Sequence, residues 1–253
     1  MMLLIVNADD LGATDKINDE VFALMQSGLV TSATIMANAA AFEDAAKRSR
    51  EFPHCSFGIH LVLTSYRPIS DTRGLEPILD ENGCFSRKLF QTAAITRDLQ
   101  KAMLRELSAQ VQRTLDAGIP LSHFDSHHHV HIIPKMFPVL KALQKKFGMR
   151  KVRSTINLFA AGEQVTALRS IKKSAFRFAL RHFYATRSPE GFGDFRVFHA
   201  ALTAGKLPQF RSLELMVHPG TINPVYSKEV ECLRSDWQRL LPPGAILGSY
   251  HGL

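Results

Sequence analysis

Apolar residues occur along this chain in two alternating patterns, short continuous runs and longer stretches with helical spacing. The short runs predict β-strands at residues 3–7, 30–36, 56–61, 122–127, 151–154, 213–217 and 245–250. The longer stretches predict helices at residues 15–26, 40–50, 96–117, 136–147, 166–184 and 228–240. Repeated strand–helix units are typical of parallel sheets. At this length they favour an α/β fold that is a single deformed or incomplete (β/α) barrel of the TIM type over an open doubly wound sheet.

The same pattern runs through the chain without a repeat, a low-complexity tract or a linker rich in Pro, Gly and Ser. We therefore expect one domain over residues 1–253. Gly28 and Gly118 follow two of the helical stretches, where a left-handed C-cap favours glycine. Residues 64–90 carry two prolines and two glycines and are too long for a bare connector, which predicts a substrate-facing loop or lid.

Composition places the protein in the ordinary globular class, with 45% apolar and 21% charged residues in 253. No apolar run approaches the roughly 20 residues of a membrane span, and the apolar N-terminus reaches Asp9 and Asp10 too soon for a signal peptide. We expect a cytoplasmic location. Cys55, Cys84 and Cys232 are far apart, so a disulfide framework or a thiolate zinc site is not indicated. A metal ion would need histidine and carboxylate ligands.

The net charge of +8 is concentrated in one region, because residues 141–187 hold 12 of the 31 basic residues and one of the 23 acidic residues. This argues against a nucleic-acid partner. Cationic side chains recur within the region at every fourth position: Arg169, Lys173, Arg177 and Arg181. The spacing predicts an amphipathic helix, which is most simply a surface helix packed on the barrel. Contact with an anionic membrane surface or a phosphorylated sugar is the alternative, and a homodimer stays open.

Acids, histidines and one tyrosine stand at the carboxyl ends of five predicted strands. They are Asp9 and Asp10, His60, Asp125 to His131, His218, and Tyr250 with His251. In barrels and open α/β sheets the reactive groups gather at this edge. We therefore expect these side chains to converge on one face.

The four histidines among residues 127–131 are the most informative of these features. Strand alternation would place Asp125, His127 and His129 on one face, whereas an early helical turn would pair His127 with His131 and could make His131 a ligand. So many histidines serve no packing purpose. The run therefore favours metal binding or catalysis.

Asp10, His60 and His127 come from three predicted strands and offer one carboxylate and two imidazoles to a divalent ion. Asp10 alone could be a helix N-cap, and His60 alone could be a hydrogen-bonded core histidine. Together they predict a site for one ion, Zn²⁺ or Mg²⁺, with positions left for water or substrate. A metal of this kind lowers the pKa of bound water toward about 7, so hydrolysis is the natural chemistry.

Hydrolysis also needs a base and an acid, for which we expect Asp9 and His218 respectively. Adjacent residues of a strand point to opposite faces, so Asp9 and Asp10 are expected to point in different directions and to have different roles. The other residues at the strand ends are expected to contact the substrate or to support the ligands: Asp125, His129, His131, Tyr250 and His251.

Five sequence motifs occur together in a fixed order. They are NADDLG at residues 7–12, GIHLVLT at 58–64, HFDSHHHVH at 123–131, HPG at 218–220 and GSYH at 248–251. In this combination the chain resembles the YdjC-like carbohydrate deacetylases, the chitooligosaccharide deacetylase group. The motifs span nearly the whole chain. Leu11 stands where the family more often has Phe, a conservative apolar change.

The resemblance implies a deformed (β/α) barrel, a divalent metal ion, and hydrolysis of the N-acetyl group of an N-acetylglucosamine unit in a sugar or short oligosaccharide. It implies that Asp10, His60 and His127 match the metal-binding positions and that Asp9 matches the catalytic carboxylate. The basic residues 141–187 match none of these motifs, so the reaction is better indicated than the particular N-acetylated sugar.

Two other classes of protein use similar residues. A metal-dependent phosphoesterase would suit the basic region, but it usually has more carboxylates or a second metal about 3.5–4 Å away. A non-catalytic module that binds sugar or glycolipid on the same fold is the other alternative. Retention of both Asp9 and Asp10 argues against the module, because binding does not require a spare carboxylate beside the metal.

Overall fold

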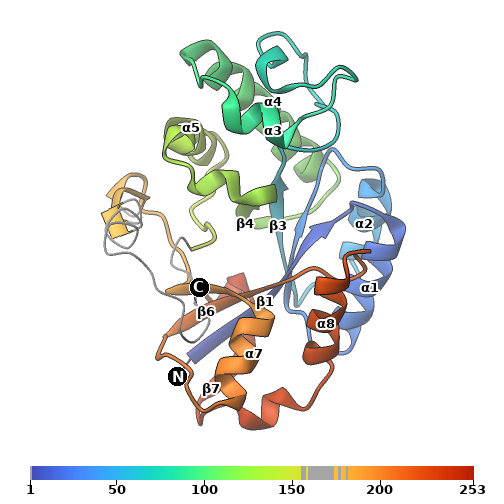
Figure 1. Ribbon diagram of the computed structural model, residues 1–253, viewed down its shortest axis with the longest axis vertical. Coiled ribbons are helices and arrows are strands. Elements are labelled where there is room, and N and C mark those ends of the chain that lie inside the picture. The colour runs from blue at the N-terminus through green and yellow to red at the C-terminus, as the bar shows by residue number, and fades with distance from the viewer. Residues whose placement is uncertain (1, 155–157, 159–173, 176–177, 181) are drawn as a thin grey trace.

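The computed structural model describes residues 2–154, 158, 174–175, 178–180 and 182–253 (Figure 1). In this part of the chain seven parallel strands form one sheet in the order β4-β3-β2-β1-β6-β5, with β7 also paired to β1. The strands are β1 Met2–Leu11, β2 Ser32–Ile35, β3 Ser56–Leu61, β4 Leu121–Ser126, β5 Gly191–Asp194, β6 Ser212–Val217 and β7 Ala245–Gly248. The chain therefore has the α/β fold with a parallel sheet that the pattern predicts.

Strand β1 lies at the centre of the sheet and pairs with three strands, β2, β6 and β7. Leu3 pairs with both Ser212 of β6 and Ile246 of β7, so these two strands lie on opposite edges of β1. Asn7 pairs with β6 and with Ser32 of β2. The edge of β1 opposite β6 is therefore shared, with β7 beside its first half and β2 beside its second. The interior residues of β1 are fully buried, as its continuous apolar run requires.

Helices cover the sheet with their apolar faces. They are α1 Asp15–Gln26, α2 Phe42–Ser49, α3 Arg87–Thr92, α4 Arg97–Asp116, α5 Phe137–Phe147, α7 Phe195–Thr203 and α8 Pro224–Leu233. The backbone N–H groups that begin α1 and α4 are capped by the hydroxyls of Thr14 and Thr96. Gly28 and Gly118 follow these two helices with φ of +71° and +83°, which confirms the predicted left-handed caps. None of the helices in the described ranges is long and apolar enough to cross a bilayer.

The unit formed by β5 and α7 is absent from the sequence prediction. Strand β5 contains two glycines and has no β-branched run, so its pattern is weak. The glycines are required by close packing: a Cβ on Gly191 would lie 2.8 Å from the ring of Phe210, and one on Gly193 would lie 2.8 Å from Leu158. Tertiary contacts therefore create this strand where local propensity does not.

The strand predicted at residues 151–154 is an extended segment held by isolated parallel bridges. The N–H of Phe124 in β4 donates to the carbonyl of Lys151 at 3.1 Å, and the N–H of Arg153 donates back to Phe124 at 3.2 Å. Further along, the N–H of Leu158 donates to Phe192 of β5 at 2.6 Å. Hydrogen bonds of this segment thus reach both outer strands of the sheet. The helix predicted at residues 166–184 lies largely outside the described residues.

Residues 64–90 are not a bare loop, since they contain a 3₁₀ turn at Glu76–Ile78 and the start of α3. The buried carboxylate of Glu106 in α4 accepts hydrogen bonds from the N–H groups of Ile69 and Ser70, at 3.0 and 2.7 Å. This carboxylate holds the beginning of segment 64–90 against α4. One of the residues in α3, Arg87, reaches the pocket described below.

Candidate active site

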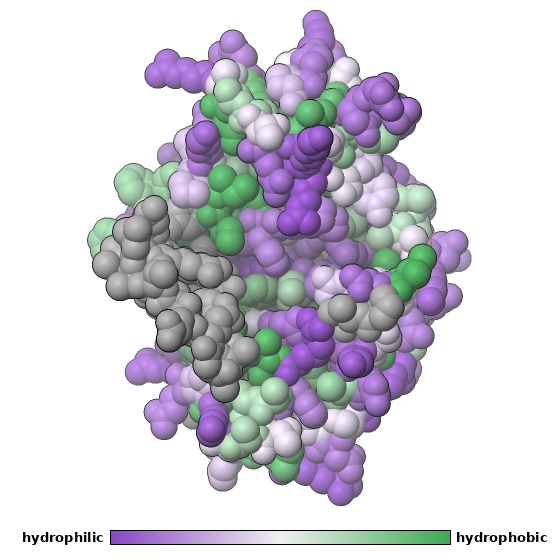
Figure 2. Space-filling model, in the orientation of Figure 1, coloured by the Kyte–Doolittle hydropathy of each residue, from purple (hydrophilic) through white to green (hydrophobic). Residues whose placement is uncertain are grey.

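A pocket of about 760 Å³ opens at the carboxyl ends of β1, β3, β4 and β6. Figure 2 shows hydrophilic side chains in the hollow at the centre of this face. Seven of the acids and histidines expected from the sequence line the pocket: Asp9, Asp10, His60, His127, His128, His129 and His218. The strand-end pattern therefore brings together residues that are up to about two hundred positions apart in the chain.

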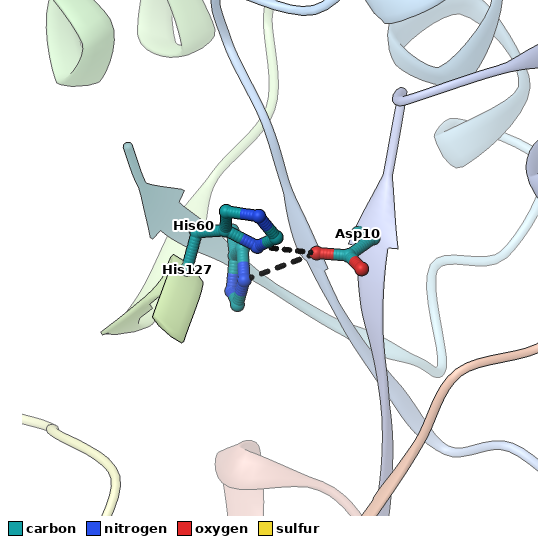
Figure 3. Close-up of side chains that lie close together, drawn as sticks. All are labelled: Asp10, His60 and His127. Carbon is teal, nitrogen blue, oxygen red and sulfur yellow. Dashed lines mark hydrogen bonds and ion pairs between the residues drawn. The ribbon is translucent and has the colours of Figure 1, made fainter. Parts of the chain in front are cut away.

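Three of these side chains form a tight group (Figure 3). The Oδ1 atom of Asp10 lies 3.3 Å from Nε2 of His60 and 3.1 Å from Nδ1 of His127. All three ligand atoms lie within 4.8 Å of one another. A divalent ion about 2.1 Å from each of its ligands separates them by about 3.0–3.4 Å, so this spacing fits one ion bound between the three. The donor set of one carboxylate and two imidazoles also suits a zinc-type ion.

The backbone turns sharply where these ligands sit. Asp10 has φ of +64°, and the pairing of β1 with β2 shifts register between Ala8 and Leu11. His128 and His129 also have positive φ, in a 3₁₀ turn that follows β4. Such conformations cost on the order of 1–3 kcal/mol each in residues other than glycine and cluster at functional sites. The backbone thus adopts strained conformations at these residues, whose side chains line the pocket.

The bulge at Asp10 corrects one expectation. Asp9 and Asp10 do not point to opposite faces as in a regular strand, because the left-handed residue resets the alternation, and both carboxylates line the pocket. Asp9 and Asp10 differ instead in their partners. Asp10 faces the two histidines, whereas Asp9 is held by Arg153.

Asp9 accepts a two-point ion pair from the guanidinium of Arg153. The Nη1–Oδ2 distance is 2.8 Å and the Nη2–Oδ1 distance is 2.5 Å, and the amide of Asn7 donates to Oδ1 at 2.9 Å. Burial alone would raise the pKa of Asp9, but Arg153 outweighs burial and holds that pKa well below its usual range. Asp9 is therefore a carboxylate at all ordinary pH values.

Asp125 orients the ring of His60. Its Oδ1 lies 2.6 Å from Nδ1 of His60, and the hydroxyl of Thr34 donates to its Oδ2 at 3.1 Å. A carboxylate on one ring nitrogen leaves the other nitrogen, Nε2, to face Asp10, which is the usual arrangement of a metal-binding histidine. Asp125 is fully buried behind His60, so its position fits the supporting role expected from the sequence.

Electrostatic interactions in the pocket shift the pKa values of His60, Asp10 and His129. Burial would lower the pKa of His60, but Asp125 and the other acids raise it to about 10. For Asp10, burial would raise the pKa, and the bonds to His127 and His60 hold it well below its usual range. Burial, with Arg153 nearby, lowers the pKa of His129 to about 3, so that ring is neutral.

These shifts predict that binding of Zn²⁺ releases a proton and weakens as the pH falls. A protonated His60 cannot be a ligand, and its raised pKa keeps the proton on the ring through neutral pH, so the ion must displace it. Calorimetric titration with Zn²⁺ in buffers of different ionisation enthalpy counts the released protons. Affinity that stays constant on either side of neutrality, with no proton release, would contradict the ligand assignment.

His218 approaches the pocket from β6 and is supported by α8. The backbone N–H of His218 donates to Oε2 of Glu229 at 2.5 Å, and its Nδ1 lies 3.6 Å from the same oxygen. The ring of Tyr226 lies against it, with centroids 4.2 Å apart. Burial would lower the pKa of His218, but Glu229 and the two pocket aspartates raise it. The positive charge is therefore more stable on this ring than on a free histidine.

Besides Asp125, three residues expected near the site lie outside the pocket lining in the described part of the chain. His131 is buried and its Nδ1 lies 2.6 Å from the hydroxyl of Ser126. Tyr250 is fully buried and donates to Glu214 at 2.5 Å. His251 lies 3.2 Å from the carbonyl of Cys55. The early turn after β4 does form, but it directs His131 into the core.

Sequence reasoning missed the charged residues that surround the ligands. They are Arg153, Glu214, Glu229, and the pocket-lining Lys16 and Arg87. A signal existed for Glu214, because a carboxylate inside the apolar run of β6 is costly unless it is paired. Arg153 carried less signal, since it falls in a basic region where a single arginine does not stand out.

These observations define an α/β protein with a candidate metal centre at the carboxyl edge of its parallel sheet. The chain belongs to the YdjC-like protein family, whose sequence profile matches residues 3–240. The resemblance read from the five motifs is thereby confirmed.

Curated relatives bear related names. Over 152 residues the chain is 41% identical to a carbohydrate deacetylase of Geobacillus stearothermophilus, an alignment that covers 59% of this chain and 60% of that protein. Over 233 residues it is 32% identical to a chitooligosaccharide deacetylase of Salmonella paratyphi B, covering 91% of this chain and 86% of the relative.

Solved structures show a similar fold. A protein of Enterococcus faecalis V583 named for cellobiose-phosphate cleavage has a TM-score of 0.79 and 24% identity, over 99% of this chain and 98% of that one. The Xyl-CE4 domain of a xylanase from the hindgut metagenome of Trinervitermes trinervoides has a TM-score of 0.50 and 9% identity, over 99% and 88%. At these identities the likeness concerns the fold.

Proposed function

We propose that this protein is a metal-dependent hydrolase that removes the N-acetyl group from N-acetylglucosamine-containing sugars or short chitooligosaccharides. The observation that carries the proposal is the Asp10–His60–His127 group with a second carboxylate, Asp9, beside it and a histidine of raised pKa, His218, in the same pocket. The names of the relatives support the substrate class. The pocket volume of about 760 Å³ is within the range of about 300–1,000 Å³ typical of small-molecule sites.

Asp10, His60 and His127 would hold the ion, Zn²⁺ or Mg²⁺. When bound there, such an ion lowers the pKa of water and polarises the acetyl carbonyl. Asp9 accepts the proton of the attacking water at a carboxylate oxygen. Its low pKa makes it a weak base, and Arg153 holds the carboxylate in place for this transfer. His218 then donates a proton to the nitrogen of the departing amine as the C–N bond breaks, and acetate and the free amino sugar result.

The pH dependence of the reaction reports on His218. Replacing Glu229 with Gln removes the charge that raises the pKa of His218, so the imidazolium is lost at lower pH. We expect the basic limb of the kcat/KM profile for acetate release to move to lower pH. Glu231→Gln, an exposed carboxylate on the same helix, is the matched control. A basic limb that stays in place in Glu229→Gln would remove His218 from the role of acid.

A metal-dependent phosphoesterase is less well supported by the geometry. The second acidic group among the described residues, Asp9–His60–Asp125, is fully buried, and both of its carboxylates are ion-paired to Arg153. It therefore lacks room for the second ion that such enzymes usually need. A binding module without chemistry leaves the arrangement of Asp9 and His218 unexplained.

The overall test is a metal analysis of the purified protein followed by a screen for product release. We expect stoichiometric binding of one divalent ion, and acetate from N-acetylated sugars and chitooligosaccharides. Release of inorganic phosphate from phosphorylated sugars in place of acetate would favour the phosphoesterase. Tight sugar binding with no product of either kind would favour the binding module.

Three broader expectations accompany this proposal. The sheet is an incomplete barrel, an architecture supported by the hydrogen bonds of Lys151 and Arg153 with Phe124 of β4 and of Leu158 with Phe192 of β5. Residues 1–253 form one domain. The cytoplasmic location is a prediction from the sequence. A homodimer and contact with a membrane surface are alternatives that the sequence leaves open.

A further inference from the structure

Arg153 is a fully buried cation whose five N–H groups all have acceptors. Four of them meet carboxylates: Nε reaches Glu214 at 2.9 Å, Nη1 and Nη2 hold Asp9, and Nη2 also lies 2.7 Å from Asp125. The fifth points to the sulfur of Met216 at 3.9 Å. A guanidinium is a rigid planar fork, so its Nε contact decides the angle at which the other end meets Asp9.

The carboxylate of Glu214 is hydrogen-bonded on its other side by Tyr250. Its second oxygen, Oε2, accepts the hydroxyl of Tyr250 at 2.5 Å. The ring of Tyr250 stacks on His123 with centroids 3.5 Å apart and planes 7° from parallel. Below His123 there is no free space, because a Cβ on Gly58 would lie 2.6 Å from that ring. A continuous packed column therefore runs from Gly58 to the guanidinium of Arg153.

We infer that Glu214 and Tyr250 are positioning residues that act through Arg153 to fix the carboxylate of Asp9. The inference rests on the proposed function, in which Asp9 accepts a proton. Neither Glu214 nor Tyr250 lines the pocket in the described chain, so neither can contact a substrate directly. Without Glu214, the buried Nε–H would have no acceptor, and the guanidinium would reorient between the remaining carboxylates. Asp9 would then lose one of the two bonds that set its direction.

The test compares three variants of the full chain in acetate release. In Glu214→Ala, we expect kcat to fall about 10- to 100-fold, the usual effect of losing an outer partner of a site, while KM and metal content stay unchanged. Glu214→Gln keeps an oxygen for the Nε–H of Arg153 and is expected to recover most of this loss. Tyr250→Phe removes one hydrogen bond to Glu214 and is expected to lower kcat by a smaller factor.

A matched control separates positioning from general loss of stability. Trp237 is a buried aromatic residue that packs against Phe195 and Phe198 of α7, and its Nε1 donates to the carbonyl of Leu233 at 3.0 Å. Trp237→Phe therefore also removes one buried hydrogen bond. Trp237→Phe also leaves a cavity, so we expect it to lower Tm at least as much as Tyr250→Phe, with kcat lowered only in Tyr250→Phe. Equal effects on kcat, or no effect in either variant, would overturn the inference.

Crystal structures of wild type and Glu214→Ala give a readout that does not depend on activity. We expect at least one of the two Arg153–Asp9 hydrogen bonds to lengthen beyond bonding distance in the variant. If both persist, the inference fails, even if the wild type is an active deacetylase. If wild type releases no acetate, the proposed function fails, while this structural comparison still decides the geometric claim. Should Glu214→Ala not fold, Tyr250→Phe provides the comparison, with Glu214→Gln as the variant expected to keep both Arg153–Asp9 hydrogen bonds.

Discussion

Replacing Asp10 with Ala is expected to abolish both metal binding and acetate release. The carboxylate of Asp10 is the contact common to His60 and His127, at 3.3 and 3.1 Å, so its removal leaves the ion with two imidazole ligands and no carboxylate ligand. Two neutral ligands retain a divalent ion poorly. Metal content of the purified variant, measured by atomic spectroscopy, and acetate release at saturating Zn²⁺ or Mg²⁺ provide the two readings.

Asp98→Ala is the control for this variant, because the side chain of Asp98 is 88% exposed and pairs with the exposed Lys101. It should keep full metal content and activity. An Asp10→Ala protein that still binds one ion per chain would mean that the ion sits elsewhere. A folded Asp10→Ala protein with wild-type activity would show that the reaction does not use this group.

Replacing Asp9 with Asn is expected to lower acetate release by about 10²–10⁴-fold, the usual contribution of acid–base assistance, with metal content near normal. Asn keeps the size of Asp9 but cannot accept the proton. The variant should also lose stability, since Arg153 keeps Asp125 and Glu214 but loses its two-point partner. Thermal unfolding and metal analysis run beside the kinetic assay separate these effects.

The outcome for Asp9→Asn that contradicts the assignment is equally specific. Loss of the ion would make Asp9 a ligand, and unchanged acetate release would require a different base. Asp125 would be the next carboxylate to examine, although its oxygens are engaged with His60 and Arg153. Comparing Asp9→Asn with Asp10→Ala therefore distinguishes proton transfer from metal binding.

The sequence predicted that the candidate ligands lie together because their position follows from a general rule. Parallel strands end at one edge, and Asp10, His60 and His127 each stand at or just after such an end. The rule uses only the order of strands and turns, which hydrophobic patterning reveals. It placed Asp9 and His218 in the same pocket for the same reason.

The rest of the site depends on tertiary geometry that no local pattern encodes. Arg153 lies beside Asp9 because an extended segment docks on β4, and that segment has no ladder of its own. Tyr250 follows a strand end, yet its ring turns inward to stack on His123. The bulge at Asp10 reversed the expected alternation, and a one-residue change of register cannot be read from hydrophobicity.

The shared edge of β1 also determines when its hydrogen bonds can form during synthesis. Strand β1 leaves the ribosome first, whereas its partner β7 is about 240 residues later in the chain. At about 5–20 residues per second, half of that edge stays unpaired for roughly ten seconds or longer. An apolar strand with open hydrogen-bonding groups attracts other chains during this time. Tyr250 follows β7 in the chain, so its contacts with Glu214 and His123 also form late. The residues that line the pocket are therefore synthesised before the tyrosine that holds Glu214 against Arg153.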